Sequence, residues 1–389
     1  MPIKARKYPV FNSDQELSDF LLSNLTDSLK QSIKLTVGIM VKAEMENLRK
    51  EVNEKLSFNG YYERNMTSSL GKIQGIGIPR FREQPVSGLG LRSLTVFDQE
   101  KDRFLHLVAE MHRLGVSTRK VDQICRNVFG MKFSKDRASA IHKELCDQEA
   151  LAINSQELTD EFAYLLLDGL WVKAKSFGLK QDNKTVLLCA LGITPDGQRK
   201  VIGFQPADRE DFASWGAFLQ SLKQRGLAGG KLKLCIADDN GGLAKALNRL
   251  FPSVPAQICI VHKLRNVIGR AKHKHKTAVA GDAKVIYQAE TKELAVARMQ
   301  SFAKKWYVAE PVAVESLRFN FAGTLTYFQF PKEIWKQIRT TNILEREFRE
   351  VRRRIRVFDS SFNDTGSLTR YGNSIFSYLN NHYPAALTH

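Results

Sequence analysis

Residues 164–204, YLLLDGLWVKAKSFGLKQDNKTVLLCALGITPDGQRKVIGF, decide the fold of this chain. Within this stretch, residues 164–175, 185–193 and 200–204 are runs of apolar and β-branched residues, the composition of buried strands. The Thr-Pro-Asp-Gly sequence at residues 194–197 joins the second run to the third and is a strong hairpin signal. We therefore predict three adjacent antiparallel strands.

Helices and strands alternate after this hairpin. Residues 211–225 have the apolar spacing of an amphipathic helix, and residues 232–237, 243–250 and 257–261 predict a strand, a helix and a further strand. Three antiparallel strands followed by helix, strand, helix and strand is the order of a ribonuclease H-like fold. The sequence therefore predicts an α/β fold with a ribonuclease H-like mixed sheet.

A long helical and basic stretch, residues 263–335, follows the last predicted strand. We interpret it as an all-helical insertion that separates a first part of the sheet domain, residues 156–262, from a final part, residues 336–389. The final part holds the last strong helical pattern, residues 343–357, and a C-terminal tail.

The chain before the sheet divides into three predicted regions. Residues 1–60 are helical, with an amphipathic stripe suited to packing or self-association. Residues 61–100 are rich in Gly and aromatic residues and predict short strands, in a segment that lies along a DNA groove or is a plain linker. Residues 101–155 are helical again. The stripe in the first region consists of Leu17, Phe20, Leu21, Leu25 and Leu29.

Residues 101–155 have the outline of a helix-turn-helix. Gly115 ends one predicted helix, Ser117 caps the next, and Ser134 caps a candidate recognition helix. The basic residues of that helix are Lys135, Arg137, His142 and Lys143. Helical hairpins without a DNA role are common, so the pattern leaves both a DNA-binding domain and a plain helical hairpin open.

The charge of the chain points to a polyanionic partner. The 389 residues include 59 Lys and Arg against 41 Asp and Glu, a formal net charge of +18. Such a surface attracts nucleic acid through counterion release, whereas an aid to solubility and membrane binding are the weaker alternatives. No apolar stretch approaches the roughly 20 residues of a bilayer span, and residues 1–10 lack the apolar segment of a secretory signal. We therefore expect a cytoplasmic protein that binds nucleic acid.

The five cysteines are scattered and never spaced as C-x-x-C. We expect reduced and mostly buried thiols. A structural zinc site needs four ligands, and only Cys259 with His262 offers a closely spaced pair, which is a weak signal on its own.

Asp168 is the first candidate for metal-dependent phosphoryl transfer, which needs converging carboxylates because Mg²⁺ prefers oxygen ligands. It follows four apolar or aromatic residues in a predicted central strand, where an unpaired carboxylate is costly and a metal ion would compensate for its burial. The alternative is that Asp168-Gly169 is a hairpin turn, which is the more common role of this dipeptide.

Asp238 is the second candidate. It closes the strand predicted at residues 232–237, and the C-terminal ends of strands are where open α/β sheets bind their ligands. Asp239 and Asn240 follow it directly, and any of the three residues could instead cap the next helix.

Glu345 is the third candidate. It lies three residues after Asn342, the spacing of a capping box, and four before Arg349, the spacing of a helix salt bridge. Neither of these roles involves catalysis. In a helix, however, Glu345 shares a face with Arg349, Arg352 and Arg356 that suits a phosphate backbone.

Between residues 61 and 356 the sequence resembles the Mutator-like transposases of bacterial insertion sequences. Several motifs of that family recur here in order, with Trp215 between the second and the third. They are LLLDGLWVK at residues 165–173, ALGITPDGQRKVIGF at 190–204, IADDNGGLAKAL at 236–247, CIVHKLRN at 259–266 and IRTTNILEREFREVRRRIR at 338–356.

The resemblance implies a DDE transposase with a ribonuclease H-like catalytic domain, in which Asp168, Asp238 and Glu345 are the catalytic, metal-binding acids. It also places three further residues close to the active site, which are Cys259, His262 and Asn342. One departure concerns the position after the second acid, which is usually small and neutral in the family and is Asp239 here. On sequence alone, Asp239 therefore competes with Asp238.

The resemblance further implies what the protein does. It would bind the terminal inverted repeats of its own element, cut a strand at each end, and join the exposed 3′-hydroxyls to target DNA. Two Mg²⁺ ions, for which Mn²⁺ can substitute, would stabilise the attacking and leaving oxygens. Because two ends must meet, we expect at least a homodimer on DNA, associated with the bacterial nucleoid.

Several basic residues are candidates for holding phosphate, although a charge run on a helix is more often solvated. They are Lys173, Lys175, Arg349, Arg352, Arg353 and Arg354.

The sequence leaves three alternatives to a transposase. A catalytically inactive DNA-binding protein derived from such an element would have lost an acid. A structure-specific nuclease with the same fold would need neither the N-terminal regions nor the helical insertion. A purely structural or protein-interaction module explains neither the charge nor the ordered motifs.

Overall fold

The computed structural model describes residues 13–51, 57–68, 70–82, 91–149, 153–173, 184–355 and 365–382. The chain forms two compact units, Met1–His142 and Lys143–His389. Each unit has its own hydrophobic core.

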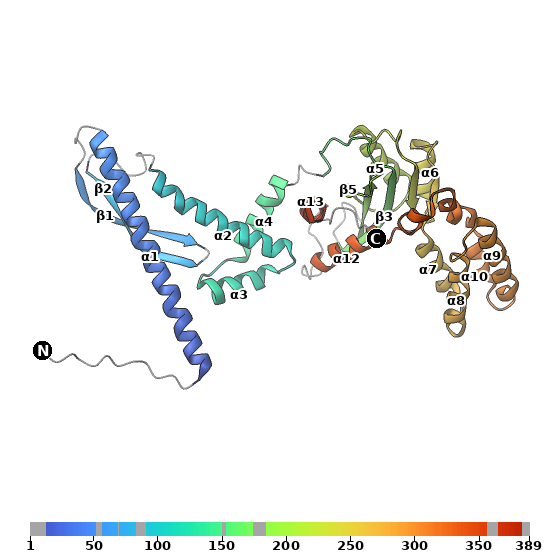
Figure 1. Ribbon diagram of the computed structural model, residues 1–389, viewed down its shortest axis with the longest axis horizontal. Helices are drawn as coiled ribbons and strands as arrows, with labels where there is room; N and C mark the ends of the chain where they lie inside the picture. Colours follow the sequence, from blue (N-terminus) through green and yellow to red (C-terminus); the bar gives the residue numbers. More distant parts are fainter. Residues whose placement is uncertain are drawn as a thin grey trace. The chain divides into compact units, whose positions relative to one another are not determined.

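The N-terminal unit begins with one long helix that lies across a hairpin (Figure 1). The helix is α1 (Asp14–Glu51), and the hairpin consists of the antiparallel strands β1 (Phe58–Ser68) and β2 (Gly71–Phe81). Val37, Val41 and Met45 of α1 are buried in the same core as the isoleucines of β2. The helical pattern predicted before residue 58 is thus one continuous helix, and the short strands predicted after it are two strands of 11 residues each.

A short 3₁₀ turn (Arg92–Leu94) and three helices complete the N-terminal unit: α2 (Thr95–Arg113), α3 (Thr118–Phe129) and α4 (Lys135–Glu149), whose last turns cross into the next unit. The predicted caps are confirmed. Ser117 Oγ accepts from Lys120 N at 3.3 Å, and Ser134 Oγ accepts from Arg137 N at 3.2 Å. Gly115 lies between α2 and α3 with a φ of 92°, a conformation that favours glycine.

The C-terminal unit is built on a five-stranded mixed sheet of order β5-β4-β3-β6-β7. Its strands are β3 (Tyr164–Lys173), β4 (Lys184–Ile193), β5 (Arg199–Ala207), β6 (Leu234–Ala237) and β7 (Ala256–Ile258). β3 pairs antiparallel with β4 and parallel with β6. This confirms the three antiparallel strands and the hairpin between β4 and β5, which is closed by a 3.0 Å bond from Thr194 N to Gln198 O.

The last strand is shorter than predicted. Cys259 N donates to Ala237 O at 2.6 Å, and the backbone turns into a helix at Ile260. The apolar residues predicted to extend the strand to residue 261 therefore begin this helix instead.

Helices cover both faces of the sheet. α5 (Phe212–Gln224) and α6 (Gly241–Leu250) pack on the face that carries Leu165 and Leu167. α12 (Asn342–Ile355) and α13 (Thr365–His382) pack on the other face, which carries Leu166 and Leu170. The sequence pattern predicts only a tail after residue 357, and α13 is therefore a difference between the prediction and the structure.

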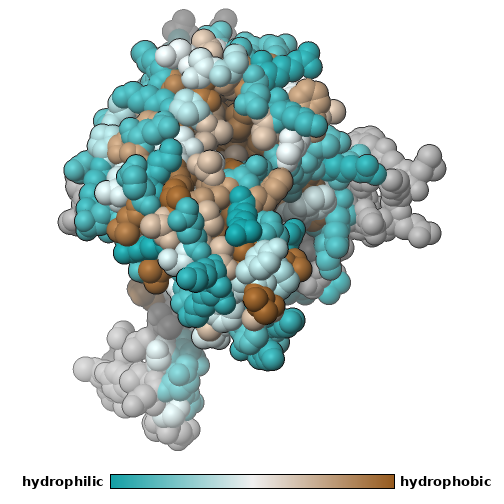
Figure 2. Space-filling view, turned by 90° about the vertical axis from the view of Figure 1, so that its right-hand side faces the viewer, coloured by the Kyte–Doolittle hydropathy of each residue, from teal (hydrophilic) through white to brown (hydrophobic). Residues whose placement is uncertain are grey.

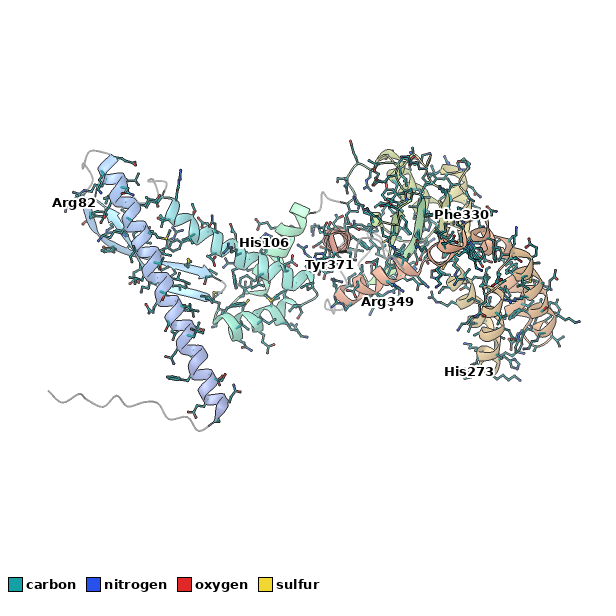
Figure 3. The ribbon with its side chains drawn as sticks, in the orientation of Figure 1. Arg82, His106, His273, Phe330, Arg349 and Tyr371 are labelled. Atoms are coloured by element: carbon teal, nitrogen blue, oxygen red, sulfur yellow. The ribbon has the colours of Figure 1, made fainter. Side chains whose placement is uncertain are left out.

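The stretch predicted as a helical insertion, residues 263–335, is helical in the structure, and its helices extend slightly beyond these bounds. It consists of α7 (Ile260–Arg270), α8 (Lys276–Ile286), α9 (Lys292–Trp306), α10 (Pro311–Arg318) and α11 (Trp335–Ile338), with 3₁₀ segments at His273–His275, Phe321–Gln329 and Lys332–Ile334. Its core is continuous with that of the sheet. Phe330 (Figure 3) meets the ring of Tyr164 on β3 edge-on, with 6.2 Å between ring centroids.

The surface of the C-terminal unit mixes polar and apolar side chains. Figure 2 shows apolar groups in the middle of one face and hydrophilic groups around them. On the helical insertion, Tyr307 and Val308 line a groove of about 440 Å³ together with Met299 and Arg318. Among the described residues, no helix combines the length and the apolar character that crossing a bilayer would require.

Candidate active site

Asp168 lies in the middle of β3, the central strand of the sheet, and is only 8% exposed. The strand continues through it, because Asp168 pairs with Cys189 and Gly169 with Leu188 of β4. The alternative of a hairpin turn at this dipeptide is therefore wrong. Asp168 is two residues away from both Leu166 and Leu170, so all three side chains point to the same face of the sheet. This is the face that α12 covers.

Asp238 follows directly after β6, the parallel neighbour of β3. The pairing of Leu166 with Ile236 puts Asp168 and Asp238 in the same register, each two positions beyond that pair. Asp238 Oδ1 is buried and has no hydrogen-bond partner among the described residues. Its neighbour Asn240 performs the capping role, accepting from the backbone N–H groups of α6 at 2.8 and 3.1 Å. Asp238 is thus a half-buried acid with one carboxylate oxygen that lacks a hydrogen-bond partner among the described residues.

Both carboxylate oxygens of Asp239 are bound by side chains of the helical insertion. Lys263 Nζ lies 2.8 Å from its Oδ2, and Asn320 Nδ2 donates to its Oδ1 at 2.8 Å. Lys263 is only 2% exposed and also donates to the backbone oxygen of Phe319 at 2.6 Å. These contacts bind the end of β6 to the helical insertion, and they favour Asp238 over Asp239 as the acid available to a ligand.

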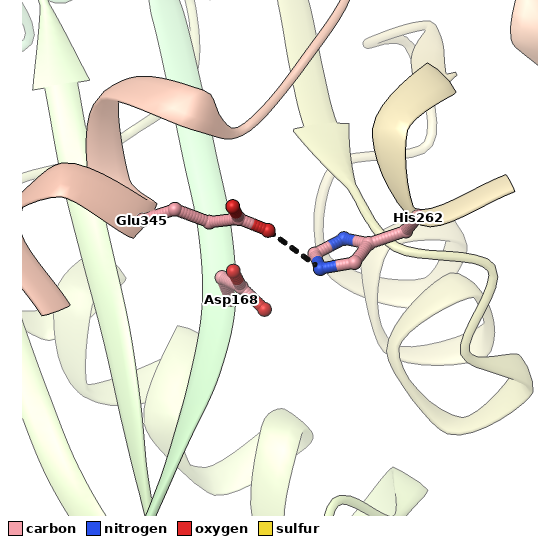
Figure 4. A group of neighbouring side chains, drawn as sticks. All are labelled: Asp168, His262 and Glu345. Atoms are coloured by element: carbon pink, nitrogen blue, oxygen red, sulfur yellow. Dashed lines mark ion pairs between the residues drawn. The ribbon is translucent and has the colours of Figure 1, made fainter. Parts of the chain in front are cut away.

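Glu345 lies in the first turn of α12 and points toward α7 (Figure 4). Its Oε1 is 3.0 Å from His262 Nε2 and 3.2 Å from Arg265 Nη2. Among the described residues it forms no ion pair with Arg349, and the N–H of Asn342 donates to Thr340 Oγ1 rather than to Glu345. Neither the capping box nor the helix salt bridge considered from the sequence is formed.

Cys259 connects the two helices that carry His262 and Glu345. Its buried sulfur accepts from both the N–H and the hydroxyl of Thr341, each at 3.3 Å. Thr341 directly precedes α12, and Cys259 directly precedes α7. The thiol therefore fixes the start of one helix against the start of the other. The other described cysteines whose side chains are placed, Cys125, Cys189 and Cys235, are also free and buried, as predicted.

Burial and mutual repulsion set the protonation of the acids. Burial and the carboxylates of Asp238 and Glu345 raise the pKa of Asp168 to about 7, despite the opposing effect of His262. Burial also raises the pKa of Asp238. A hydrogen bond from His262 lowers the pKa of Glu345 to about 2. Burial disfavours the charged ring of His262, but the side chains of Cys259 and Glu345 raise its pKa to about 10.

The site has the composition of a divalent metal centre. Asp168, His262 and Glu345 each present a ligand atom, and these atoms all lie within 4.8 Å of one another. Buried carboxylates are stable only when they are paired or bind a cation, and Asp238 Oδ1 has no protein partner among the described residues. Carboxylate oxygens are hard ligands that suit Mg²⁺ or Mn²⁺. The residues present therefore fit a divalent metal ion.

Two charged residues of this region were missed from the sequence. Glu210 lies just before α5, and its side chain approaches β3 at Gly169. A Cβ atom added at Gly169 would lie 2.7 Å from the carboxyl carbon of Glu210. Burial and Asp238 raise the pKa of Glu210. Lys263 looked like one of many surface lysines. No local pattern marks either residue, because their partners lie in distant segments.

The candidate phosphate contacts differ in exposure. Lys173, Arg349 (Figure 3), Arg352 and Arg353 are exposed. Arg353 pairs with Glu350 at 3.0 Å. The prediction that Arg354 contacts phosphate is corrected, because this residue is only 3% exposed. Its guanidinium group pairs with Glu350 at 2.6 Å and lies over the ring of Tyr378. Arg354 therefore makes its contacts within the protein.

In the N-terminal unit, Arg137 of α4 is exposed and lies over the ring of Phe133, 5.6 Å from its centroid. Lys143, at the start of the next unit, is exposed as well. The backbone of Lys135 begins α4, and the candidate Lys175 lies outside the described residues.

Comparison with known proteins identifies relatives across nearly the whole chain. Residues 8–386 match the family described as "Transposase, Mutator family". The transposase for insertion sequence element ISRM5 of Rhizobium meliloti is 32% identical over 357 residues, which cover 89% of this chain and 86% of that protein. The transposase for IS905 of Lactococcus lactis is 28% identical over 94% of this chain and 93% of its own length. The transposase for IS256 in transposon Tn4001 of Staphylococcus aureus is 29% identical over 88% of this chain and 89% of its own.

Proposed function

Because this chain belongs to the Mutator family of transposases, we propose that it cuts and joins DNA at the ends of its insertion sequence with divalent metal ions bound to Asp168, Asp238 and Glu345. In this proposal the five-stranded sheet and its flanking helices are a ribonuclease H-like catalytic core, and the three acids are a DDE triad.

One observation carries the proposal. Acids from three distant segments converge at the centre of the sheet: Asp168 from the middle of β3, Asp238 after the neighbouring strand β6, and Glu345 from α12. Repulsion between them is unfavourable unless a cation is bound. A cluster kept at such a cost is typical of a functional site.

Each residue has a defined part in this proposal. The three carboxylates hold the metal ions, and His262 and Arg265 orient Glu345 through hydrogen bonds of 3.0 and 3.2 Å. Cys259 keeps α7 and α12 in place, and Asn342 begins the helix that carries Glu345. Two Mg²⁺ ions, or Mn²⁺ in their place, supply charge stabilisation for the attacking and leaving oxygens of an in-line displacement.

The same site would serve two steps on DNA. A water molecule attacks a phosphodiester at the element end and breaks its P–O3′ bond, which releases a 3′-hydroxyl and leaves a 5′-phosphate. This 3′-hydroxyl then attacks a phosphodiester of the target DNA, whose own P–O3′ bond breaks and releases a 3′-hydroxyl on the target strand. The net charge of +18 supports binding to both DNAs. In this proposal α2, α3 and α4 read the terminal inverted repeats, with Lys135, Arg137 and Lys143 at or near the DNA. Lys173, Lys175, Arg349, Arg352 and Arg353 are the proposed phosphate contacts of the C-terminal unit. A protein acting on chromosomal DNA in this way would work in the cytoplasm at the nucleoid.

The test is strand cleavage and joining on labelled DNA that carries the element's own ends, with Mg²⁺ or Mn²⁺. We expect Asp168→Asn, Asp238→Asn and Glu345→Gln each to lose about 10³-fold or more in rate, because several kcal/mol of transition-state stabilisation depend on the metal ions. DNA binding should persist in all three. Asp208→Asn, at an exposed acid of the same unit, is the matched control and should keep full activity.

Other outcomes would change the proposal. Full activity in one acid variant would remove that residue from the triad. Wild-type DNA binding without any cleavage would favour an inactive DNA-binding protein. Cleavage of branched DNA without joining would favour a structure-specific nuclease.

A further inference from the structure

The backbone around Asp238 is fixed on both sides. Before it, the carbonyl oxygen of Ala237 accepts a backbone N–H from the start of α7 at 2.6 Å. After it, side chains of the helical insertion bind Asp239, and Asn240 Nδ2 donates to Glu210 O at 3.0 Å. In this loop Asp238 Oδ1 is buried and lacks a hydrogen-bond partner among the described residues. The neighbours of Asp238 are thus held in place, while one of its own oxygens is left for a ligand.

The amine of Lys263 is surrounded by acceptors. It donates to Asp239 Oδ2 at 2.8 Å, to Phe319 O at 2.6 Å and to Ser316 O at 3.3 Å. An ammonium group has three N–H donors, so each of them has an acceptor here. The two carbonyl groups belong to the C-terminal end of α10, where the helix dipole favours a positive charge. The amine therefore joins α7 and α10 to the loop after β6.

Asn320 is the second residue that binds Asp239. Its Nδ2 donates to Asp239 Oδ1 at 2.8 Å. The φ of Asn320 is 50°, and no other non-glycine residue of the described ranges has a positive φ. Asparagine adopts this left-handed conformation more easily than most residues, but the conformation is still costly. A costly backbone conformation persists only where the surrounding contacts compensate for it, and the bond to Asp239 is such a contact.

The helix α7 contacts two of the proposed metal ligands. His262 Nε2 lies 3.0 Å from Glu345 Oε1. The next residue, Lys263, binds Asp239, the direct neighbour of Asp238. A displacement of α7 would therefore change the separation between the carboxylates of Glu345 and Asp238. The helical insertion thus affects the geometry of the site, although none of the three acids lies in it.

We propose that Lys263 and Asn320 are positioning residues, which hold Asp238 in the direction required for metal binding by fixing the side chain of Asp239. This inference rests on the proposed function, because it takes Asp238 as a metal ligand. Replacing a residue that orients a metal ligand typically lowers metal affinity or activity by about 10- to 100-fold. The alternative is that the contacts of Asp239 only stabilise the fold.

The first experiment uses Asn320→Gly. This variant removes the amide that binds Asp239 but keeps a residue that adopts a positive φ without strain. Because Asn320 is exposed, we expect the midpoint of urea unfolding to stay close to that of the wild type. Affinity for Mn²⁺, measured from the electron paramagnetic resonance signal of the free ion, should fall by about 10-fold. Wild-type affinity in Asn320→Gly would overturn the proposal.

A matched control destabilises the insertion without changing the contacts of Asp239. Thr291 caps α9, and its Oγ1 accepts from Leu294 N at 3.2 Å. Thr291→Ala should lower the midpoint of urea unfolding through the loss of this cap, and it should leave the affinity for Mn²⁺ unchanged. If Thr291→Ala weakens Mn²⁺ binding as much as Asn320→Gly does, stability alone controls the site and the proposal is wrong.

The second experiment separates the position of Asp238 from the stability of the fold. Lys263→Met alone leaves Asp239 without its counter-charge, so it affects both properties. The double variant Lys263→Met with Asp239→Leu removes both charges, which leaves the net charge beside the site unchanged and should recover most of the stability. It should still bind Mn²⁺ about 10- to 100-fold more weakly than the wild type. Recovery of both stability and Mn²⁺ affinity would overturn the proposal.

The wild type and Asp238→Asn test the metal site itself. Binding of Mn²⁺ that is lost in Asp238→Asn would support that site, whatever the result for Lys263 and Asn320. A wild type that binds no Mn²⁺ would overturn the metal site and, with it, the positioning role. Strand cleavage provides a further check, because Asn320→Gly should approach the wild-type rate at saturating Mn²⁺ and fall below it at low Mn²⁺. A rate that is equally low at every Mn²⁺ concentration would contradict a role in metal binding.

Discussion

The two units of this protein depart in opposite ways from the usual pattern, in which charged side chains are exposed and large apolar side chains are buried. In the C-terminal unit, charged groups are buried: Asp168, Lys263 and Arg354 are each at most 8% exposed. In the N-terminal unit, large apolar groups are exposed along α1, with Leu35 at 66% and Ile39 at 59%. A buried charge needs a counter-charge or a metal ion, and an exposed apolar stripe needs a partner.

The difference shows how each kind of site can be recognised. The proposed catalytic site contains Asp238 Oδ1, which is one of several buried polar atoms without a hydrogen-bond partner among the described residues. Exposed large apolar side chains are found in both units: Leu35 on α1 is 66% exposed, and Val308 on the helical insertion is 93% exposed. Substitutions that reverse one property at a time can test this contrast.

Lys263→Met should have the largest effect on stability. It leaves Asp239, which is only 12% exposed, without its 2.8 Å ion pair. Removing one partner of a buried pair typically costs about 3–5 kcal/mol of unfolding free energy. Urea unfolding followed by Trp fluorescence measures the change in the C-terminal unit, because all four Trp residues of the chain lie there.

The control for Lys263→Met is the double variant Lys263→Met with Asp239→Leu. It removes both charges, and we expect it to recover most of the lost stability. If the double variant is as unstable as the single one, the other contacts of Lys263, to Ser316 O and Phe319 O, dominate instead of the ion pair.

Two methionines of α1 provide the next comparison. Met45 is completely buried against the hairpin, whereas Met40 is 54% exposed on the outer face. Met45→Ala should cost about 2–5 kcal/mol of unfolding free energy at any protein concentration. Met40→Ala should cost less than about 0.5 kcal/mol in the monomer, since it removes no intramolecular packing.

Hydrogen exchange of α1 measures both effects. We expect Met45→Ala to lower the protection of α1 and Met40→Ala to leave it unchanged. A loss of protection by Met40→Ala that does not change with dilution would show that its side chain packs within one chain.

Arg352→Ala should have the smallest effect. Arg352 is exposed on α12, in contrast to the buried Arg354 two residues later. We expect stability to change by less than about 0.5 kcal/mol, and the salt dependence of DNA binding to fall by about one phosphate contact. Binding titrations at several salt concentrations measure that slope. An unchanged slope would mean that Arg352 is only solvated.

Much of the C-terminal unit could be predicted because its signals are local. The apolar runs around Leu166 and Leu188 and the turn at Gly197 each reflect the strand or turn they form. The caps at Ser117 and Ser134 are equally local. The sequence predicts Asp168 and Glu345 as candidate metal ligands. Excluding a hairpin turn at Asp168 and a capping box at Glu345 required the contacts that these residues make with distant segments of the chain.

The features that were missed depend on contacts between distant segments. Nothing near Lys263 indicates that Asp239 and the backbone after α10 would surround its amine. Glu210 is important only because Gly169 leaves room for it. The end of β7 was misplaced because an apolar run fits the start of a buried helix as well as a strand.

The long sequence separation between Asp168 and Glu345 has a consequence for how the protein is made. Contacts between distant segments form late, because closing long loops costs entropy before such contacts become stabilising. In contrast, α1 and its hairpin are consecutive in the chain and are synthesised before Glu345. Because the N-terminal unit has a core of its own, it can fold before Glu345 has been added to the chain.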